Sequence, residues 1–224
     1  MDIVSLLLLL GSMLITLGAS AYIKINYNKF KKIGVSSGMT GYDVAREILD
    51  RNNLSHILII ETQGELSDHY DPGKKVIKLS HDVYHGKTIA AVSVASHECG
   101  HALQDKDGYA FLKFRSSIVP LVNFSSKIGY VAIMAGLLLS IAKLIWIGIA
   151  FEIVILLFQL VTLPVEFNAS DRALTLIKEY AFVNNHEQDG AKKMLVSAAL
   201  TYVASVIATV MELLRLVLMF SRRD

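Results

Sequence analysis

The stretch SVASHECGHALQ, residues 93–104, places two histidines and a glutamate in an otherwise apolar segment. A buried ionisable side chain costs free energy unless another group pairs with it or it coordinates a metal. His97 and His101 are four residues apart, so on a helix they project from one face and can share one metal ion. Residues 88–104 have the apolar spacing of a helix. The stretch therefore predicts a helix that carries two metal ligands.

Glu98, directly after the first histidine, has the position of a general base. Zinc in a catalytic site takes three protein ligands and leaves a fourth position for a water, whose pKa it lowers. Glu98 can reach that water rather than the metal and accept its proton, which generates a hydroxide nucleophile at neutral pH. The strand-like run VIKLS, residues 76–80, precedes the motif as expected of a zinc-dependent peptidase that pairs an extended substrate with an edge strand.

The third zinc ligand has to come from elsewhere in the chain, and three residues compete for this role. Asp105 and Asp107 follow the motif in QDKDGY, a segment that otherwise has the character of a polar helix exit. Glu166 in LPVEFNASDRA is favoured, because it follows a predicted membrane hairpin and opens a predicted helix after Pro164. Its alternative role is a first-turn glutamate that interacts with the helix dipole.

Several further polar residues could support such a site. Ser170 lies one turn beyond Glu166 with Asp171 beside it, and either could accept a hydrogen bond from a ligand histidine and fix its tautomer. Cys99 falls on the opposite face of the motif helix and is predicted to be a small buried hydrophobe. The candidates to donate a hydrogen bond to the oxyanion of a tetrahedral intermediate are His69, Tyr70, His81, Tyr84 and His85.

Apolar runs on both sides of the motif predict about four membrane helices, and the mean hydropathy of the chain is +0.47. Residues 3–23 carry no charge and can cross about 30 Å of hydrocarbon as a helix. Residues 118–163 suit two spans with a tight turn near 140–143. Residues 194–220 form a last apolar run that either spans the bilayer or lies at its interface. The lysines after the first span, by the positive-inside rule, place residues 24–116 in the cytoplasm; they are Lys24, Lys29, Lys31 and Lys32.

The polar segment between the first two spans contains signals for a small mixed domain. TGYDVAREILDRNN predicts a helix with Thr40 as its N-cap, and HILIIE and KVIKLS flank the turn signal DPGK, which predicts a small sheet or hairpin. The expected organisation is a transmembrane helix (1–23), a cytoplasmic half with the HECGH helix (24–116), a transmembrane hairpin (117–163), a helix with the third ligand (164–193) and a C-terminal membrane helix (194–220).

Composition excludes some functions and leaves others open. The net charge of +2 gives no basic surface for nucleic acid, and a single cysteine excludes an intramolecular disulfide framework and fits a reducing compartment. The expected partners are a peptide or membrane-protein substrate and the lipid bilayer. The sequence does not define an oligomeric state.

Three segments in this order resemble a known family: DHYDPGKKVIKLS, DVYHGKTIAAVSVASHECGHALQ and LPVEFNASDRAL, with a membrane hairpin before the last. They resemble the neutral zinc metallopeptidases of bacterial membranes, the YugP type, and more distantly the HtpX-type membrane proteases. The resemblance implies zinc, the ligands His97, His101 and Glu166, and Glu98 as general base. Ser170 stands where the HtpX pattern has aspartate.

These observations predict a mainly α, integral membrane protein with a small α+β zincin-like domain of the gluzincin type. The expected function is a zinc metalloendopeptidase, multi-pass in the cell membrane, with its active site facing the cytoplasm and with membrane-proximal proteins or peptides as substrates. Two alternatives remain: a non-catalytic zinc-binding membrane scaffold, and an intramembrane protease of the site-2 type. The uncharged run before His97, residues 88–96, is too short to cross a bilayer, which disfavours the second.

Overall fold

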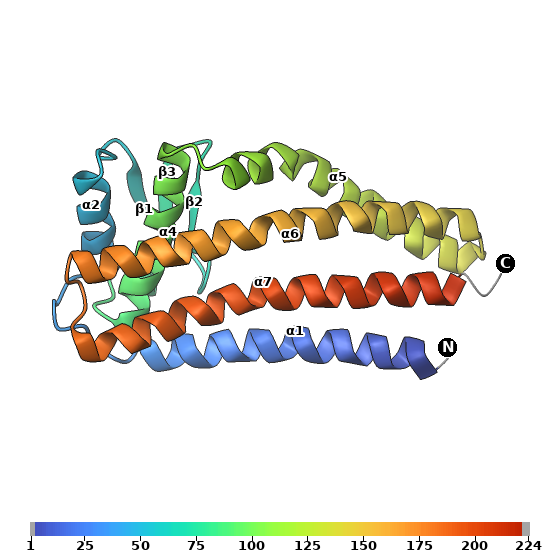
Figure 1. Ribbon diagram of the computed structural model, residues 1–224, viewed down its shortest axis with the longest axis horizontal. Coiled ribbons are helices and arrows are strands. Elements are labelled where there is room, and N and C mark those ends of the chain that lie inside the picture. Colours follow the sequence, from blue (N-terminus) through green and yellow to red (C-terminus); the bar gives the residue numbers. More distant parts are fainter. Residues whose placement is uncertain (1–2, 221–224) are drawn as a thin grey trace. The chain divides into compact units, whose positions relative to one another are not determined.

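The computed structural model describes residues 3–220 and is mainly helical (Figure 1). A small sheet of three strands interrupts the helices between α2 and α3. In chain order the elements are α1 (Ile3–Phe30), α2 (Gly41–Arg51), β1 (Leu58–Thr62), β2 (His69–Asp71), β3 (Val76–Ser80), α3 (His81–Tyr84), α4 (Ile89–Lys106), α5 (Ala110–Leu139), α6 (Ala142–Glu179) and α7 (Asn185–Phe220).

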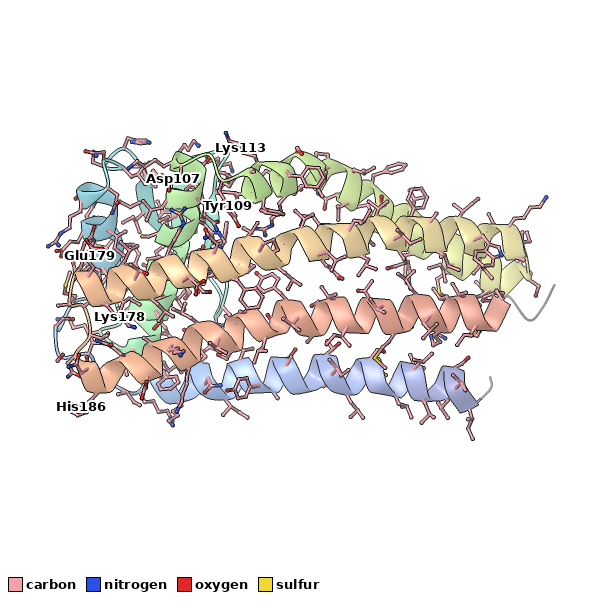
Figure 2. All side chains as sticks on the ribbon, in the orientation of Figure 1. Asp107, Tyr109, Lys113, Lys178, Glu179 and His186 are labelled. Atoms are coloured by element: carbon pink, nitrogen blue, oxygen red, sulfur yellow. The ribbon has the colours of Figure 1, made fainter. Side chains whose placement is uncertain are left out.

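The chain divides into two compact units. The first, called here the apolar unit, comprises Met1–Ser20, Lys113–Pro164 and Leu200–Asp224. The second, called here the mixed unit, comprises Ala21–Leu112 and Val165–Ala199. The mixed unit contains the whole sheet, α2 to α4 and the polar ends of α6 and α7, where Figure 2 labels Lys178, Glu179 and His186.

Within residues 3–220, four helices are long and apolar enough to cross a membrane: α1, α5, α6 and α7. Only 6% to 22% of the residues in their most apolar windows are buried within the protein, so most of these side chains need an apolar solvent such as lipid. The prediction of four membrane helices is confirmed in length and composition. The predicted tight turn is also confirmed, because α5 ends at Leu139, α6 begins at Ala142, and Ser140 between them has a positive φ of 55°.

The core of the mixed unit forms where α2 packs on α4. Thr40 caps α2, because its side chain accepts a hydrogen bond from the backbone N–H of Asp43 while the Asp43 carboxylate accepts from the backbone N–H of Thr40. Ile48 and Leu49 are fully buried in this core, and burial of such a side chain contributes about 1.5–3 kcal/mol. The predicted helix and its N-cap are therefore confirmed.

The sheet has the order β1-β3-β2, with β1 parallel and β2 antiparallel to β3. The prediction of a small sheet is confirmed. DPGK, however, connects β3 with the preceding strand β2, which has only three residues and was not predicted from the sequence. The prediction that VIKLS is an edge strand is wrong. Four of the five residues of β3 are buried, which suits a strand with neighbours on both sides, so the edges of the sheet are β1 and β2.

We expected a new helix to begin after Pro164, but this proline lies inside α6. A proline removes one N–H donor from the helix ladder, but an apolar environment supplies no water for free backbone groups, so the helix remains the least costly conformation. α6 therefore continues through the proline and carries Glu166 and Ser170 on the same rigid element. Two other long helices extend beyond the predicted ranges: α1 continues to Phe30, and α7 already begins at Asn185.

Candidate metal centre

The three candidate ligands lie together within the mixed unit. His97 and His101 project from α4, and Glu166 projects from α6. Glu166 Oε2 is 3.3 Å from His97 Nε2 and 3.6 Å from His101 Nε2, and one ligand atom of each side chain lies within 4.8 Å of the other two. His101 and Glu166 are buried and His97 is partly buried.

These separations fit a tetrahedral metal site better than direct hydrogen bonds. Zinc binds imidazole nitrogen and carboxylate oxygen at about 2.0–2.2 Å, so two ligand atoms on a tetrahedral ion are about 3.3–3.5 Å apart. A charge-assisted hydrogen bond would instead bring nitrogen and oxygen to about 2.7–2.9 Å. The distances of 3.3 and 3.6 Å from Glu166 to the two imidazoles lie close to the tetrahedral value. The donor set and its spacing therefore fit zinc.

The electrostatics of the centre favour a cation. Glu98 and Glu166 are both buried, with 6% and 3% of their surface exposed. Burial alone would lower the pKa of His101, but the nearby carboxylates of Glu166 and Glu98 outweigh burial and raise that pKa. The charges that favour a proton on the imidazole also favour a divalent cation between the ligands. Such a cation would compensate two carboxylates that are otherwise costly to bury.

Gln104 fixes the tautomer of His101, a role that we did not predict. The Gln104 amide Nε2 donates hydrogen bonds to Val165 O at 2.8 Å and to Asn168 Oδ1 at 3.0 Å. Its Oε1 is therefore the atom that faces His101 Nδ1, at 3.0 Å, and the imidazole must carry its proton on Nδ1. The Nε2 lone pair is then available to a metal. The sequence spacing could have indicated this role, because Gln104 lies three residues after His101 on the same helix face.

Ser170 has the corresponding contact with the other histidine. Its Oγ lies 3.2 Å from His97 Nδ1, so in the tautomer with a free Nε2 lone pair the imidazole N–H donates to the hydroxyl. Of the two residues that we considered for this role, the structure brings Ser170 to the histidine, whereas Asp171 is exposed. A hydroxyl thus occupies the place where the more distant HtpX-type pattern has a carboxylate.

Gly100 allows α4 and α6 to approach closely at the centre. A Cβ atom at this position would lie 2.6 Å from the backbone oxygen of Ala169, well inside van der Waals contact. Ala169 is three residues after Glu166 on α6. The small residue inside HECGH therefore sets the distance at which the carboxylate reaches the two imidazoles.

The competing ligands Asp105 and Asp107 have other partners. Asp105 Oδ2 accepts hydrogen bonds from Tyr70 Oη at 2.6 Å and from Lys75 Nζ at 2.5 Å. Asp107 Oδ2 pairs with Arg172 Nη1 at 2.6 Å. These contacts use the carboxylates to hold β2 and α6 against the end of α4, so the geometry favours Glu166 as the third ligand.

The remaining polar candidates also lie in contacts outside the His97, His101 and Glu166 cluster. The Tyr84 ring contacts those of Tyr42 and His85, with ring centroids 4.9 and 4.8 Å apart. His69 Nδ1 is 2.8 Å from Ser67 O. His81 and His85 contact Glu61. Cys99 is fully buried, and burial raises the pKa of its thiol, as expected of a core residue rather than a metal ligand.

A matched pair of substitutions tests the role of Gln104. Gln104→Leu removes the acceptor for His101 Nδ1–H, so we expect zinc affinity to fall about 10–100-fold, as is typical when a ligand loses its hydrogen-bond partner. Gln104→Glu keeps an acceptor for His101 Nδ1–H but cannot donate to Val165 O, so it should restore only part of the affinity. The exposed Gln63→Leu is the control for the same chemical change. Competition with a chromophoric chelator measures the dissociation constant, and equal affinity in Gln104→Leu and wild type would remove this role.

In the described part of the chain, four apolar helices and a largely buried His-His-Glu cluster define a multi-pass membrane protein with a candidate zinc centre. Comparison with known proteins identifies the family. The chain belongs to the family described as "Putative neutral zinc metallopeptidase", whose model matches residues 5–221. It is 46% identical over 198 residues to the "Putative membrane protease YugP" of Bacillus subtilis (strain 168), a match that covers 88% of each chain. The resemblance to this family is thus confirmed. No solved structure matches the chain.

Proposed function

We propose that this protein is a zinc-dependent endopeptidase of the gluzincin type, which hydrolyses peptide bonds of membrane-proximal proteins or peptides. The observation that carries this proposal is the convergence of His97, His101 and Glu166, whose ligand atoms lie within 4.8 Å of one another, with the buried Glu98 next to His97 in the sequence. The family description and the name of the Bacillus relative support a protease. Helix α4 and the adjacent sheet would form the zincin-like part.

In this mechanism zinc, when bound by the two histidines and Glu166, supplies Lewis-acid chemistry that polarises the scissile carbonyl and acidifies water. Glu98 accepts the proton of the attacking water and then donates it to the leaving amine. Gln104 and Ser170 hold the imidazoles in the tautomer that presents Nε2. The buried position of Glu98, with 6% of its surface exposed, keeps bulk water away from the proton transfer.

The sheet suggests how a peptide would bind. β2 is an outer strand, and Tyr70 on β2 donates a hydrogen bond to Asp105 on α4, one turn after His101. We therefore assign substrate pairing to the edge of β2 rather than to β3, because an extended peptide adds to an outer strand. The cytoplasmic orientation rests on the lysines that follow the first apolar run, by the positive-inside rule.

Two features favour this function over the alternatives. Among the described residues, α4 is not one of the four helices that could span a membrane, so HECGH does not lie on a candidate span as an intramembrane protease requires. A scaffold that only held zinc would need the three ligands but no general base, so the presence of Glu98 directly after His97 argues for catalysis.

The direct test is proteolysis by the full chain in lipid vesicles. Peptides prepared from casein serve as the probe, and mass spectrometry detects new peptide ends. We expect cleavage that 1,10-phenanthroline abolishes, that added zinc restores, and that the non-chelating 1,7 isomer leaves unchanged. Cleavage that continues in the zinc-free protein would contradict the proposed function.

A further inference from the structure

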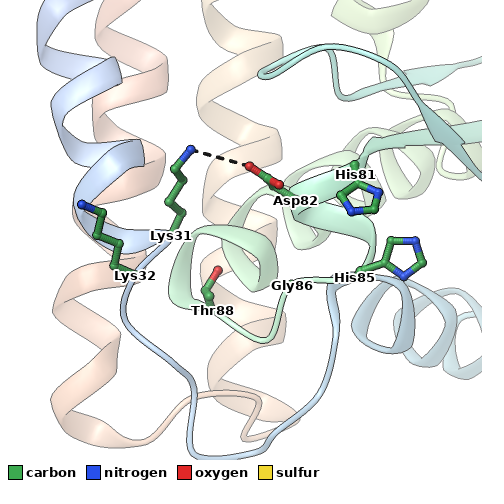
Figure 3. Close-up of a pocket in the computed structure, with 7 residues that line it drawn as sticks. All are labelled: Lys31, Lys32, His81, Asp82, His85, Gly86 and Thr88. Atoms are coloured by element: carbon green, nitrogen blue, oxygen red, sulfur yellow. Dashed lines mark ion pairs between the residues drawn. The ribbon is translucent and has the colours of Figure 1, made fainter.

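A second cluster of metal-binding side chains lies on the surface of the mixed unit. It consists of Glu61 at the end of β1 and of His81 and His85, which begin and follow the short helix α3. One ligand atom of each residue lies within 4.8 Å of the other two. Figure 3 shows the two imidazoles side by side at the rim of an open pocket.

The two histidines have the sequence spacing of the HECGH pair. His81 and His85 are four residues apart, and their ring centroids are 4.8 Å apart, compared with 4.7 Å for His97 and His101. A glutamate from another element faces each pair: Glu61 of β1 faces His81 and His85, and Glu166 of α6 faces His97 and His101. Two imidazoles one helical turn apart and a carboxylate are a ligand set that suits zinc and similar divalent transition metals.

Glu61 contacts both histidines at once. Its Oε1 is 2.6 Å from His81 Nδ1, and its Oε2 is 3.0 Å from His85 Nε2. The nearby Lys31 forms ion pairs with Glu65 and, at 3.6 Å, with Asp82. Figure 3 shows the pair with Asp82. The positive charge of Lys31 is therefore compensated.

The separations of 2.6 and 3.0 Å are shorter than the distance of about 3.3–3.5 Å between ligands on a tetrahedral ion. All three side chains are exposed, so small rotations can open the cluster without repacking the core. The same exposure means that water completes the coordination and that binding is weaker than at a buried site.

We propose that Glu61, His81 and His85 form a second divalent-metal site of the zinc class, separate from the HECGH centre. α3 lies between β3 and α4, so a metal held here would tie the end of β1 to the segment that leads into the HECGH helix. The site adds a structural ion to the protein and takes no part in the chemistry at Glu98.

Zinc titration of the full chain tests this site. The protein is produced in detergent with a tag that contains no histidine, and zinc is the only metal supplied. In a His97→Ala/His101→Ala background, we expect one zinc equivalent to remain. Addition of His81→Ala/His85→Ala, or of Glu61→Ala, should weaken this remaining binding at least about tenfold, since two ligands or the only carboxylate are lost. His56→Ala/His186→Ala removes two exposed histidines outside the cluster and should change nothing.

A second measurement leaves the HECGH centre intact. Wild type should bind two zinc equivalents and the His81→Ala/His85→Ala variant one, with cleavage of casein peptides retained. If the His97→Ala/His101→Ala protein binds no zinc although it is folded by circular dichroism, or if His81→Ala/His85→Ala leaves the wild-type stoichiometry unchanged, the second site does not exist. Both outcomes leave the proposed peptidase function untouched.

Discussion

Glu98→Gln should slow peptide cleavage by about 10²–10⁴-fold, the usual contribution of a general base, while zinc remains bound. The amide has the size of the carboxylate but cannot accept a proton from water. Glu98 is not one of the three proposed ligands, in which Glu166 lies 3.3 and 3.6 Å from the two imidazoles, so the metal ligands keep their geometry. The rate of casein-peptide cleavage and the zinc content are measured on the same preparation.

The control for this substitution is Glu179→Gln, at the exposed C-terminal end of α6 (Figure 2). This variant carries the same chemical change far along the chain from Glu98 and should cleave at the wild-type rate. Activity of Glu98→Gln within about threefold of wild type, with zinc bound, would show that another group activates the water.

The motif residues of the centre could be predicted because their arrangement depends on one helix only. The spacing of His97 and His101 places both on one face of α4, wherever α4 packs. Glu166 required topology as well, since it reaches α4 only because the chain returns after a membrane hairpin. Gln104 could not be assigned, because its role depends on Val165 O, an atom 61 residues away.

Local signals also predicted parts of the fold and failed where long-range pairing decides. Thr40 and the turn at Ser140 were expected from neighbouring residues alone. The edge strand β2 was missed, because its three residues show too little alternation and its place depends on the pairing of Tyr70 with Ile77. The continuation of α6 through Pro164 was missed because the apolar environment outweighs the local preference.

Glu166→Ala should remove zinc from the HECGH centre. This carboxylate is the only proposed ligand outside α4, and it lies 3.3 Å from His97 and 3.6 Å from His101. Two imidazoles alone do not make a structural or catalytic zinc site, which takes three or four protein ligands. Loss of a ligand's hydrogen-bond partner lowers metal affinity about 10–100-fold. We expect loss of the ligand Glu166 itself to lower zinc affinity by more than this.

Controls separate a lost ligand from a damaged fold. Glu166→Gln preserves the side-chain volume but weakens the metal bond, and it should also lose zinc while its circular dichroism matches wild type. Asp105→Ala and Asp107→Ala remove the competing carboxylates, which contact Tyr70, Lys75 and Arg172 instead, and should keep zinc.

The most direct measurement is the zinc content of Glu166→Ala after dialysis, made in a His81→Ala/His85→Ala background so that the second cluster contributes nothing. The account predicts about one zinc per chain with Glu166 present and almost none in Glu166→Ala. Equal zinc content in the two proteins would show that the two histidines and Glu166 do not share a metal, and would contradict the centre on which the proposed function rests.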